Sequence, residues 1–171
     1  MIQITVDDHE VQAALTRLSL RAQNLQPILQ TIGEDIMERA KKRFASSTGP
    51  DGARWAANAR ATVEAFVRSK GHAVSSPRGV ALSAHKKPLI GLSGDLRREI
   101  HSVATPTSLV VGAVMQYAAI QQFGGKKSAY PHLWGDIPAR PFLPIKQNGE
   151  LYPEDKARIL EMLQRYISGG Q

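Results

Sequence analysis

The residue types most able to carry chemistry are sparse in this chain of 171 residues. It has no cysteine, which excludes disulfides, thiolate metal sites and cysteine nucleophiles. No two of its five histidines have the i, i+4 spacing that places a pair of zinc ligands on one helix face. His132 and Asp136 are four residues apart, but Pro131 and Gly135 indicate a loop there. We therefore expect no metal site, no cofactor and no catalytic residues.

The segment from Gly124 to Ser128, Gly-Gly-Lys-Lys-Ser, has the appearance of the end of a phosphate-binding loop. That motif requires a glycine five positions before Gly125, where this chain has Ile120. It also requires a hydroxyl side chain directly after the first lysine, where Lys127 stands. The segment instead predicts the end of a helix, with Gly124 as a left-handed cap and lysines near the last carbonyls.

Basic residues are concentrated in the middle of the chain, although its net charge is only +7. Residues 37–98 contain 13 Lys or Arg and 4 Asp or Glu, a balance of +9. Such a segment contacts nucleic acid, contacts acidic faces of other proteins, or is simply solvated. Single-strand binders interleave several aromatics with the charges, whereas only Trp55 lies close by. The candidate contacts to DNA or to an acidic partner are Lys41, Lys42, Arg43 and Arg54.

Two segments late in the chain, residues 117–125 and 137–143, have the pattern of a rigid structural element, and together they are called the clip. Residues 117–125, Tyr-Ala-Ala-Ile-Gln-Gln-Phe-Gly-Gly, combine a short apolar helix with a double-glycine stop. Residues 137–143, Ile-Pro-Ala-Arg-Pro-Phe-Leu, contain two prolines that fix their own φ angles and bias the preceding residues to extended geometry. We expect Phe142 to enter the domain's own core and Arg140 to be available for an interface.

Trp55 is expected to be a core anchor, because the turn at residues 50–52 fixes the chain before it. Together with the clip it completes the set of residues expected to serve an interface or a structural motif: Trp55, Tyr117, Gln121, Gln122, Phe123, Gly124, Gly125, Arg140, Pro141 and Phe142.

Hydrophobic periodicity predicts the elements that position these residues. The strongest pattern follows Pro27, where Ile28, Leu29, Ile32, Ile36, Ala40 and Phe44 form one helical stripe, and this helix is expected to be the main packing element. Residues 71–88 have little periodicity and are predicted to be a mobile loop. The remaining predictions are a strand at 2–6, helices at 11–22, 58–70, 94–100, 115–123 and 153–167, a hairpin at 101–105 and 108–114, and a short strand at 143–146.

These elements predict one α+β domain over residues 1–171, with N-terminal helices packed on a small, mostly antiparallel sheet and a C-terminal helix. Apolar residues make up 42 % of the chain, which is ordinary for a globular fold. No signal peptide is recognisable, and no apolar run approaches the ~20 residues of a membrane span. We expect no membrane contact.

Four motifs occur in an order and spacing that resemble the phage virion morphogenesis family, the tail completion proteins of Mu-like and related tailed phages. They are residues 50–55 (Pro-Asp-Gly-Ala-Arg-Trp), residues 89–97 (Leu-Ile-Gly-Leu-Ser-Gly-Asp-Leu-Arg), residues 111–113 with 117–125, and residues 137–143. The resemblance covers nearly the whole chain. The chain has Gln121 where the family usually has histidine, and Pro144 where it often has glycine.

The resemblance implies a non-enzymatic structural protein of the virion, assembled in the cytoplasm of the bacterial host. It would lie at the head–tail junction, in the neck or at the upper tail end, and complete the tail for joining to the head. A ring of identical subunits in contact with other neck and tail proteins is implied. The basic segment keeps open the alternative of a DNA-binding accessory protein, and a nuclease is a more distant one.

Overall fold

The computed structural model describes residues 9–91, 94–133 and 135–169, so the strand predicted at residues 2–6 lies outside them. The described residues form an α+β arrangement, as predicted, with a two-stranded antiparallel sheet and a C-terminal helix. The elements are α1 (His9–Gln23), α2 (Gln26–Ser46), α3 (Arg60–Ser69), α4 (Pro77–His85), α5 (Asp95–Arg98), β1 (Ile100–Ala104), β2 (Leu109–Ala113), α6 (Ala118–Phe123) and α7 (Pro153–Ser168).

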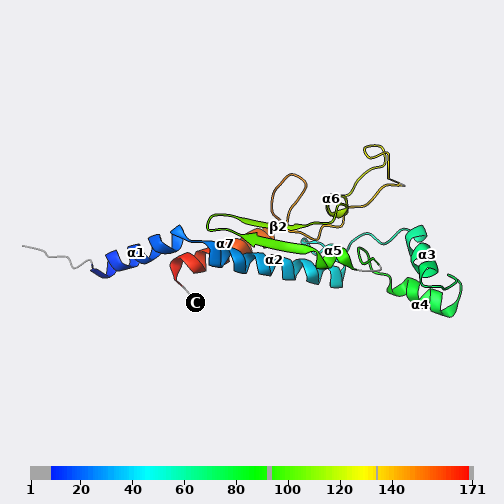
Figure 1. The fold of residues 1–171 in the computed structure, drawn as a ribbon, viewed down its shortest axis with the longest axis horizontal. Helices are drawn as coiled ribbons and strands as arrows, with labels where there is room; N and C mark the ends of the chain where they lie inside the picture. The colour runs from blue at the N-terminus through cyan, green and yellow to red at the C-terminus, as the bar shows by residue number, and fades with distance from the viewer. Residues whose placement is uncertain (1–8, 92–93, 134, 170–171) are drawn as a thin grey trace, which may run out of the picture.

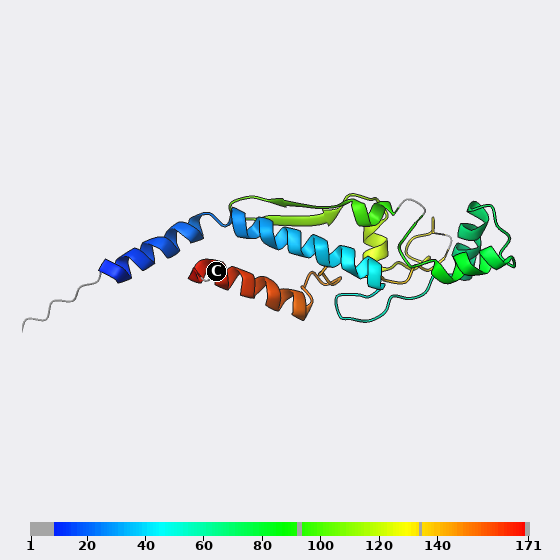
Figure 2. The same cartoon turned by 90° about the horizontal axis from the view of Figure 1, so that it is seen from below.

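Helix α2 is the central element of the molecule. Pro27 lies in its first turn, where no amide hydrogen is needed, and Ser47 ends it in a left-handed conformation with φ 57°. The predicted stripe is largely buried on this helix, and it includes Ile32, Ala40 and Phe44. Figure 2 shows three layers, with the hairpin on one side of α2 and α7 on the other.

The hairpin of β1 and β2 packs one face on α2. Its register pairs Ile100 with Ala113 and Val103 with Val110. Helix and hairpin approach closely at Gly33, where an added Cβ would lie 2.9 Å from the Ser102 Cβ. Any larger side chain at this point would push the hairpin away from the helix, since interiors are close-packed.

Apolar side chains gather in two clusters along α2. Towards its N-terminal end Ile28, Ile32 and Ile36 pack with partly buried residues of α7, such as Leu163. Towards its C-terminal end the cluster consists of Ala40, Phe44, Trp55, Leu96, Ile100, Ala118 and Phe142. The second cluster therefore joins segments that lie up to 102 residues apart, from Ala40 to Phe142, and supports the clip.

Helices α3 and α4 form a lobe, residues 60–85, that projects from the end of the molecule opposite α1 (Figure 1). The prediction that residues 71–88 lack regular structure is wrong, because α4 occupies Pro77–His85. The Ser76 hydroxyl accepts a hydrogen bond from the Gly79 amide at 3.0 Å, and Pro77 follows at the first helical position. The cap at Ser76 and the proline at the first helical position stabilise the start of this helix, although its hydrophobic periodicity is weak.

Three further predictions need smaller corrections. Helix α5 has Gly94 as its N-cap, at φ 70°, and ends at Arg98, two residues earlier than predicted. Helix α6 begins at Ala118, three residues later than predicted. The strand predicted at residues 143–146 is reduced to a single bridge between Ile145 and Leu151.

Candidate functional site

The clip residues meet the C-terminal end of α2. The Phe142 ring lies with its centroid 5.3 Å from that of Phe44, and the Trp55 ring stands edge-on to Phe44 at 5.5 Å. The indole Nε1 of Trp55 donates a hydrogen bond to the carbonyl of Pro141 at 3.0 Å. Trp55 and Phe142, both expected in the core, are buried. The aromatic contacts thus fix the proline-rich segment onto the helix.

Gln122 is a buried clamp between α6 and this segment. Its Oε1 accepts hydrogen bonds from the amides of Phe142 and Leu143, at 2.9 and 3.0 Å. Its Nε2 donates to the carbonyls of Leu143 and Ile145, at 3.1 and 2.9 Å. Only 3 % of the residue is exposed, so these four bonds replace the water that its amide loses on burial.

The double glycine lets the chain turn back beside the proline-rich segment. Gly124 has φ 75° and ψ 174°, so its φ is positive as expected but its ψ is not that of a left-handed helix. A Cβ there would lie 2.9 Å from the Ala139 nitrogen, a distance that excludes other residues without movement of the backbone. Gly125 then exchanges two backbone hydrogen bonds with Ile137, at 2.9 and 2.8 Å.

Arg43 was predicted to contact DNA or an acidic partner on the surface, and this prediction is wrong. Its Nη2 donates to both carboxylate oxygens of Asp155, at 2.8 and 2.7 Å, and its Nη1 donates to the Phe142 carbonyl at 3.1 Å. Both side chains are buried. Arg43 lies at the border of the apolar stripe, and this position was the only sequence signal that it faces the interior.

The other basic candidates remain on the surface. Lys42 pairs with Glu38 at 2.7 Å, and both side chains are exposed. Lys41 and Arg54 are exposed and have no ion-pair partner among the residues that the structure describes. Arg39, next to them in sequence, pairs with Glu154 and Asp155 at 2.9 and 3.2 Å. Much of the basic run is therefore neutralised within the chain.

Arg140 is buried, so the prediction that it is available at an interface is also wrong. Its Nε and Nη2 donate to the carbonyls of Ala56 and Ala57, at 2.9 and 2.8 Å, and its own amide donates to the Gln121 carbonyl at 2.8 Å. Burial lowers the pKa of its guanidinium from the ordinary value. Arg140 ties the clip to the segment that leads into the lobe.

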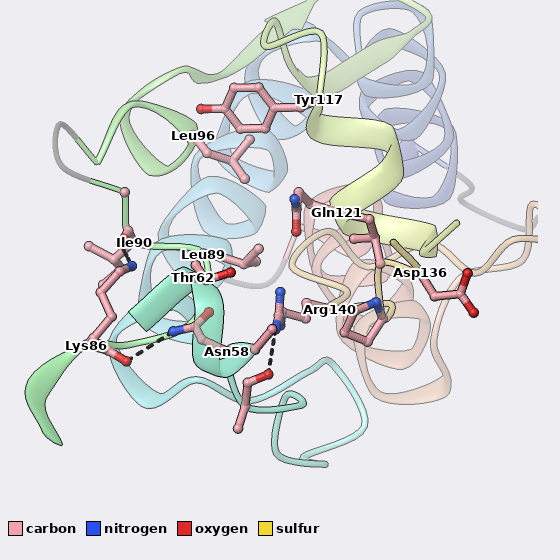
Figure 3. A pocket seen from close by; sticks show the side chains of 15 residues that line it. Asn58, Thr62, Lys86, Leu89, Ile90, Leu96, Tyr117, Gln121, Asp136 and Arg140 are labelled. Atoms are coloured by element: carbon pink, nitrogen blue, oxygen red, sulfur yellow. Dashed lines mark hydrogen bonds between the residues drawn. The ribbon is translucent and has the colours of Figure 1, made fainter. Parts of the chain in front are cut away.

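A cavity of about 430 Å³ lies between the clip and the base of the lobe. Figure 3 shows Lys86, Gln121 and Arg140 around it, together with the exposed Tyr117 at the start of α6. The Gln121 Oε1 is buried and has no hydrogen-bond partner within the described part of the chain. Sequence reasoning missed Lys86 because it lies in the segment predicted to have no structure.

The outer face of the hairpin exposes three valines beside His101, which pairs with Glu99. Val103 and Val110, which pair across the strands, are 64 % and 66 % exposed, and Val114 just beyond β2 is 68 % exposed. Phe123 at the end of α6 is 36 % exposed. Exposed apolar side chains gathered on one face indicate a contact with another protein.

His132 and Asp136, in the loop between Gly125 and Ile137, do not form a common site. The Asp136 Oδ1 accepts a hydrogen bond from the Lys127 amide at 2.8 Å, and the His132 ring stands edge-on to that of Tyr130 at 6.2 Å. Within residues 9–91, 94–133 and 135–169, no three His, Asp or Glu side chains are grouped as a metal site would need. Over the same residues, no helix has the length and apolar character required to span a membrane.

The exposed valines of the hairpin are a candidate contact with another protein. The model of the phage virion morphogenesis family matches residues 6–168 of this chain, and the chain therefore belongs to that family. Membership indicates a structural or assembly role in a phage particle, in contact with other virion proteins. Comparison with curated proteins and with solved structures gives no match.

Proposed function

We propose that this protein completes the upper end of a phage tail for joining to the head, as a ring of identical subunits and without catalysing a reaction. Family membership supports the virion role. The single structural observation that carries the ring is the exposed valine face of the hairpin, formed by Val103, Val110 and Val114.

The shape of the subunit supports an assembled state. The molecule is elongated, with α1 and the lobe at opposite ends (Figure 1). An elongated shape exposes more surface than a compact one of the same mass. Contacts with neighbouring subunits would cover part of that surface.

The hairpin also offers hydrogen-bonding groups to a neighbour. In the described residues β1 and β2 form a sheet of two strands only, so each has an outer edge without a strand partner. Exposed sheet edges pair readily with strands of another chain. An apolar face and two open edges on one element suit repeated contacts between identical subunits in a closed ring.

The test is electron microscopy of particles made without this protein, followed by complementation. We expect separate heads and tails in its absence. Val110→Glu should fold normally but fail to join them, because a charge would enter the subunit contact. Val80→Glu is the matched control, since Val80 is 58 % exposed but lies on α4.

Joined, infectious virions without the protein would refute the proposal, and full complementation by Val110→Glu would remove the hairpin from the ring contact. The alternative of a DNA-binding accessory protein makes a different prediction. In that case the purified protein binds duplex DNA with an affinity that falls steeply with salt. That affinity should fall when Lys41 and Arg54, two exposed candidate contacts without an ion pair in the described residues, are changed to glutamine.

A further inference from the structure

The cavity at the base of the lobe has the size of a ligand site, about 430 Å³. It lies where the chain enters and leaves the lobe, and α6 and the proline-rich segment form its other wall (Figure 3). Leu89, Ile90 and Leu96 contribute apolar surface, and Leu89 has an unusual positive φ of 59°. Such φ values in a leucine persist where the surroundings impose them, and they cluster at binding sites.

Two cations line this cavity without an acidic partner in the described residues. The Lys86 ammonium donates to the carbonyls of Ile90 and Lys87, and Arg140 donates to two backbone carbonyls. Burial lowers the pKa of Lys86, and the charge of Arg140 lowers it further. The two cations therefore repel each other in a partly dehydrated place, where an anion would be stabilised.

The acidic residue of the lining does not neutralise them. Figure 3 shows the Asp136 carboxylate directed away from Arg140, and its Oδ1 accepts a hydrogen bond from the Lys127 amide. The surrounding segment adds to the positive field, because residues 56–91 contain six Lys or Arg and one Glu, a balance of +5.

The apolar part of the lining supplies the third requirement. Leu89 and Ile90 are only half-buried where they line the cavity. A ligand for this cavity must therefore carry apolar surface as well as a negative charge. An inorganic phosphate offers no apolar surface, whereas a peptide with an Asp or Glu beside an apolar residue offers both.

We propose that this cavity binds an acidic peptide segment of a neighbouring virion protein. Its Asp or Glu side chain pairs with Lys86 and Arg140. An adjacent apolar side chain packs on Leu89 and Ile90. The inference rests on the proposed function only for the source of the peptide.

The test selects binders from a random heptapeptide library on the purified full chain. We expect the selected peptides to share an Asp or Glu next to an apolar residue. Changing that acid to its amide should weaken binding at least tenfold. A selection that gives no binders, or binders without a shared acid, would overturn the proposal, as would displacement of the peptides by short single-stranded DNA.

Two variants locate the binding. Lys86→Gln should weaken it at least tenfold, and Lys41→Gln is the matched control, since Lys41 is an exposed lysine on α2 outside the cavity lining. Ile90→Ala should also weaken binding, because it removes apolar surface from the cavity lining. Unchanged affinity in both variants would refute the assignment even if Lys86→Gln loosened the lobe.

These results are separable from those on the tail. Peptide binding by the purified protein, together with normal particles in its absence, would refute tail completion and leave the site intact. Unjoined heads and tails in the absence of the protein, together with no peptide binding, would leave tail completion intact and refute the site.

Discussion

The body of the molecule, formed by the described residues outside the lobe, differs from the base of the lobe in how its buried polar groups are paired. In the body, Arg43 is paired with Asp155 and the four amide bonds of Gln122 are formed within the chain. At the base of the lobe, the Lys86 ammonium contacts two carbonyls and the Phe66 ring rather than a carboxylate, and Gln121 leaves an acceptor unpaired in the described residues. A region whose polar groups are all hydrogen-bonded within the chain stabilises the fold. A region that leaves polar groups unpaired can still bind a partner.

The two regions also differ in their apolar cores. The body buries two continuous clusters along α2, with Phe44 and Phe142 fully covered. In the lobe, Val67 of α3 is the one buried apolar side chain among the described residues 60–85. The body should therefore unfold as one cooperative unit, while the lobe opens locally at a smaller free energy.

The largest expected effect comes from removing the aromatic centre of the body. Phe142→Ala should lower the free energy of unfolding by about 3–5 kcal/mol, because a large buried ring is lost and a cavity remains. Guanidinium chloride denaturation measures the change. Leu160→Ala is the control, since Leu160 is 48 % exposed on α7, and it should cost about 0.5 kcal/mol or less. An equal loss of unfolding free energy in the two variants would show that Phe142 is not central to the stability of the body.

A substitution in the lobe should have a smaller and more local effect. Val67→Ala removes two buried carbon atoms, worth about 1.5 kcal/mol at about 0.8 kcal/mol each. Because α3 and α4 pack mainly on each other, this loss should speed amide hydrogen exchange in α3 and α4 only. The midpoint of global unfolding should stay unchanged, and a shift there would show that lobe and body unfold together.

The smallest effect is expected at an ion pair on the rim of the body. Arg158 donates to both oxygens of Asp35, at 2.8 and 2.7 Å. This hydrogen bond is the main reason why the pKa of Asp35 is below its ordinary value of 3.8. The Arg158 side chain is 49 % exposed, so solvent screening limits the pair to about 0.2–1 kcal/mol.

The sign of the pH dependence follows from the lowered pKa of Asp35. The stabilisation is fully present above pH 3.8 and is lost as the pH falls through the folded-state value below it. Urea denaturation of Asp35→Asn should show a small loss of stability at pH 7. At a pH low enough to protonate Asp35 in both the folded and the unfolded protein, the variant and the unsubstituted protein should be equally stable. A loss of stability that persists at that pH would indicate a role of Asp35 other than its charge.

The elements of the body could largely be predicted from sequence, and those of the lobe could not. The stripe through Ile32 and Phe44 predicts α2, and the alternation around a Pro106-Thr107 turn predicts the hairpin. Helix α4 was missed because its only strong signal is the cap formed by Ser76 and Pro77, with no apolar face to bury. Local capping is a weaker sequence signal than periodicity that extends over many turns.

For the candidate site, the motifs and the family resemblance could be recognised from the residues alone, and the family match confirms the resemblance. Periodicity, glycine and proline act over a few residues, so their effects can be predicted from the local sequence. The environment of each charge, in contrast, became clear only from the fold. Arg43 meets Asp155 across 112 residues and Arg140 meets Ala56 across 84, and both leave the surface for that reason. A side chain's burial and partners depend on packing between distant segments, which the local sequence does not specify.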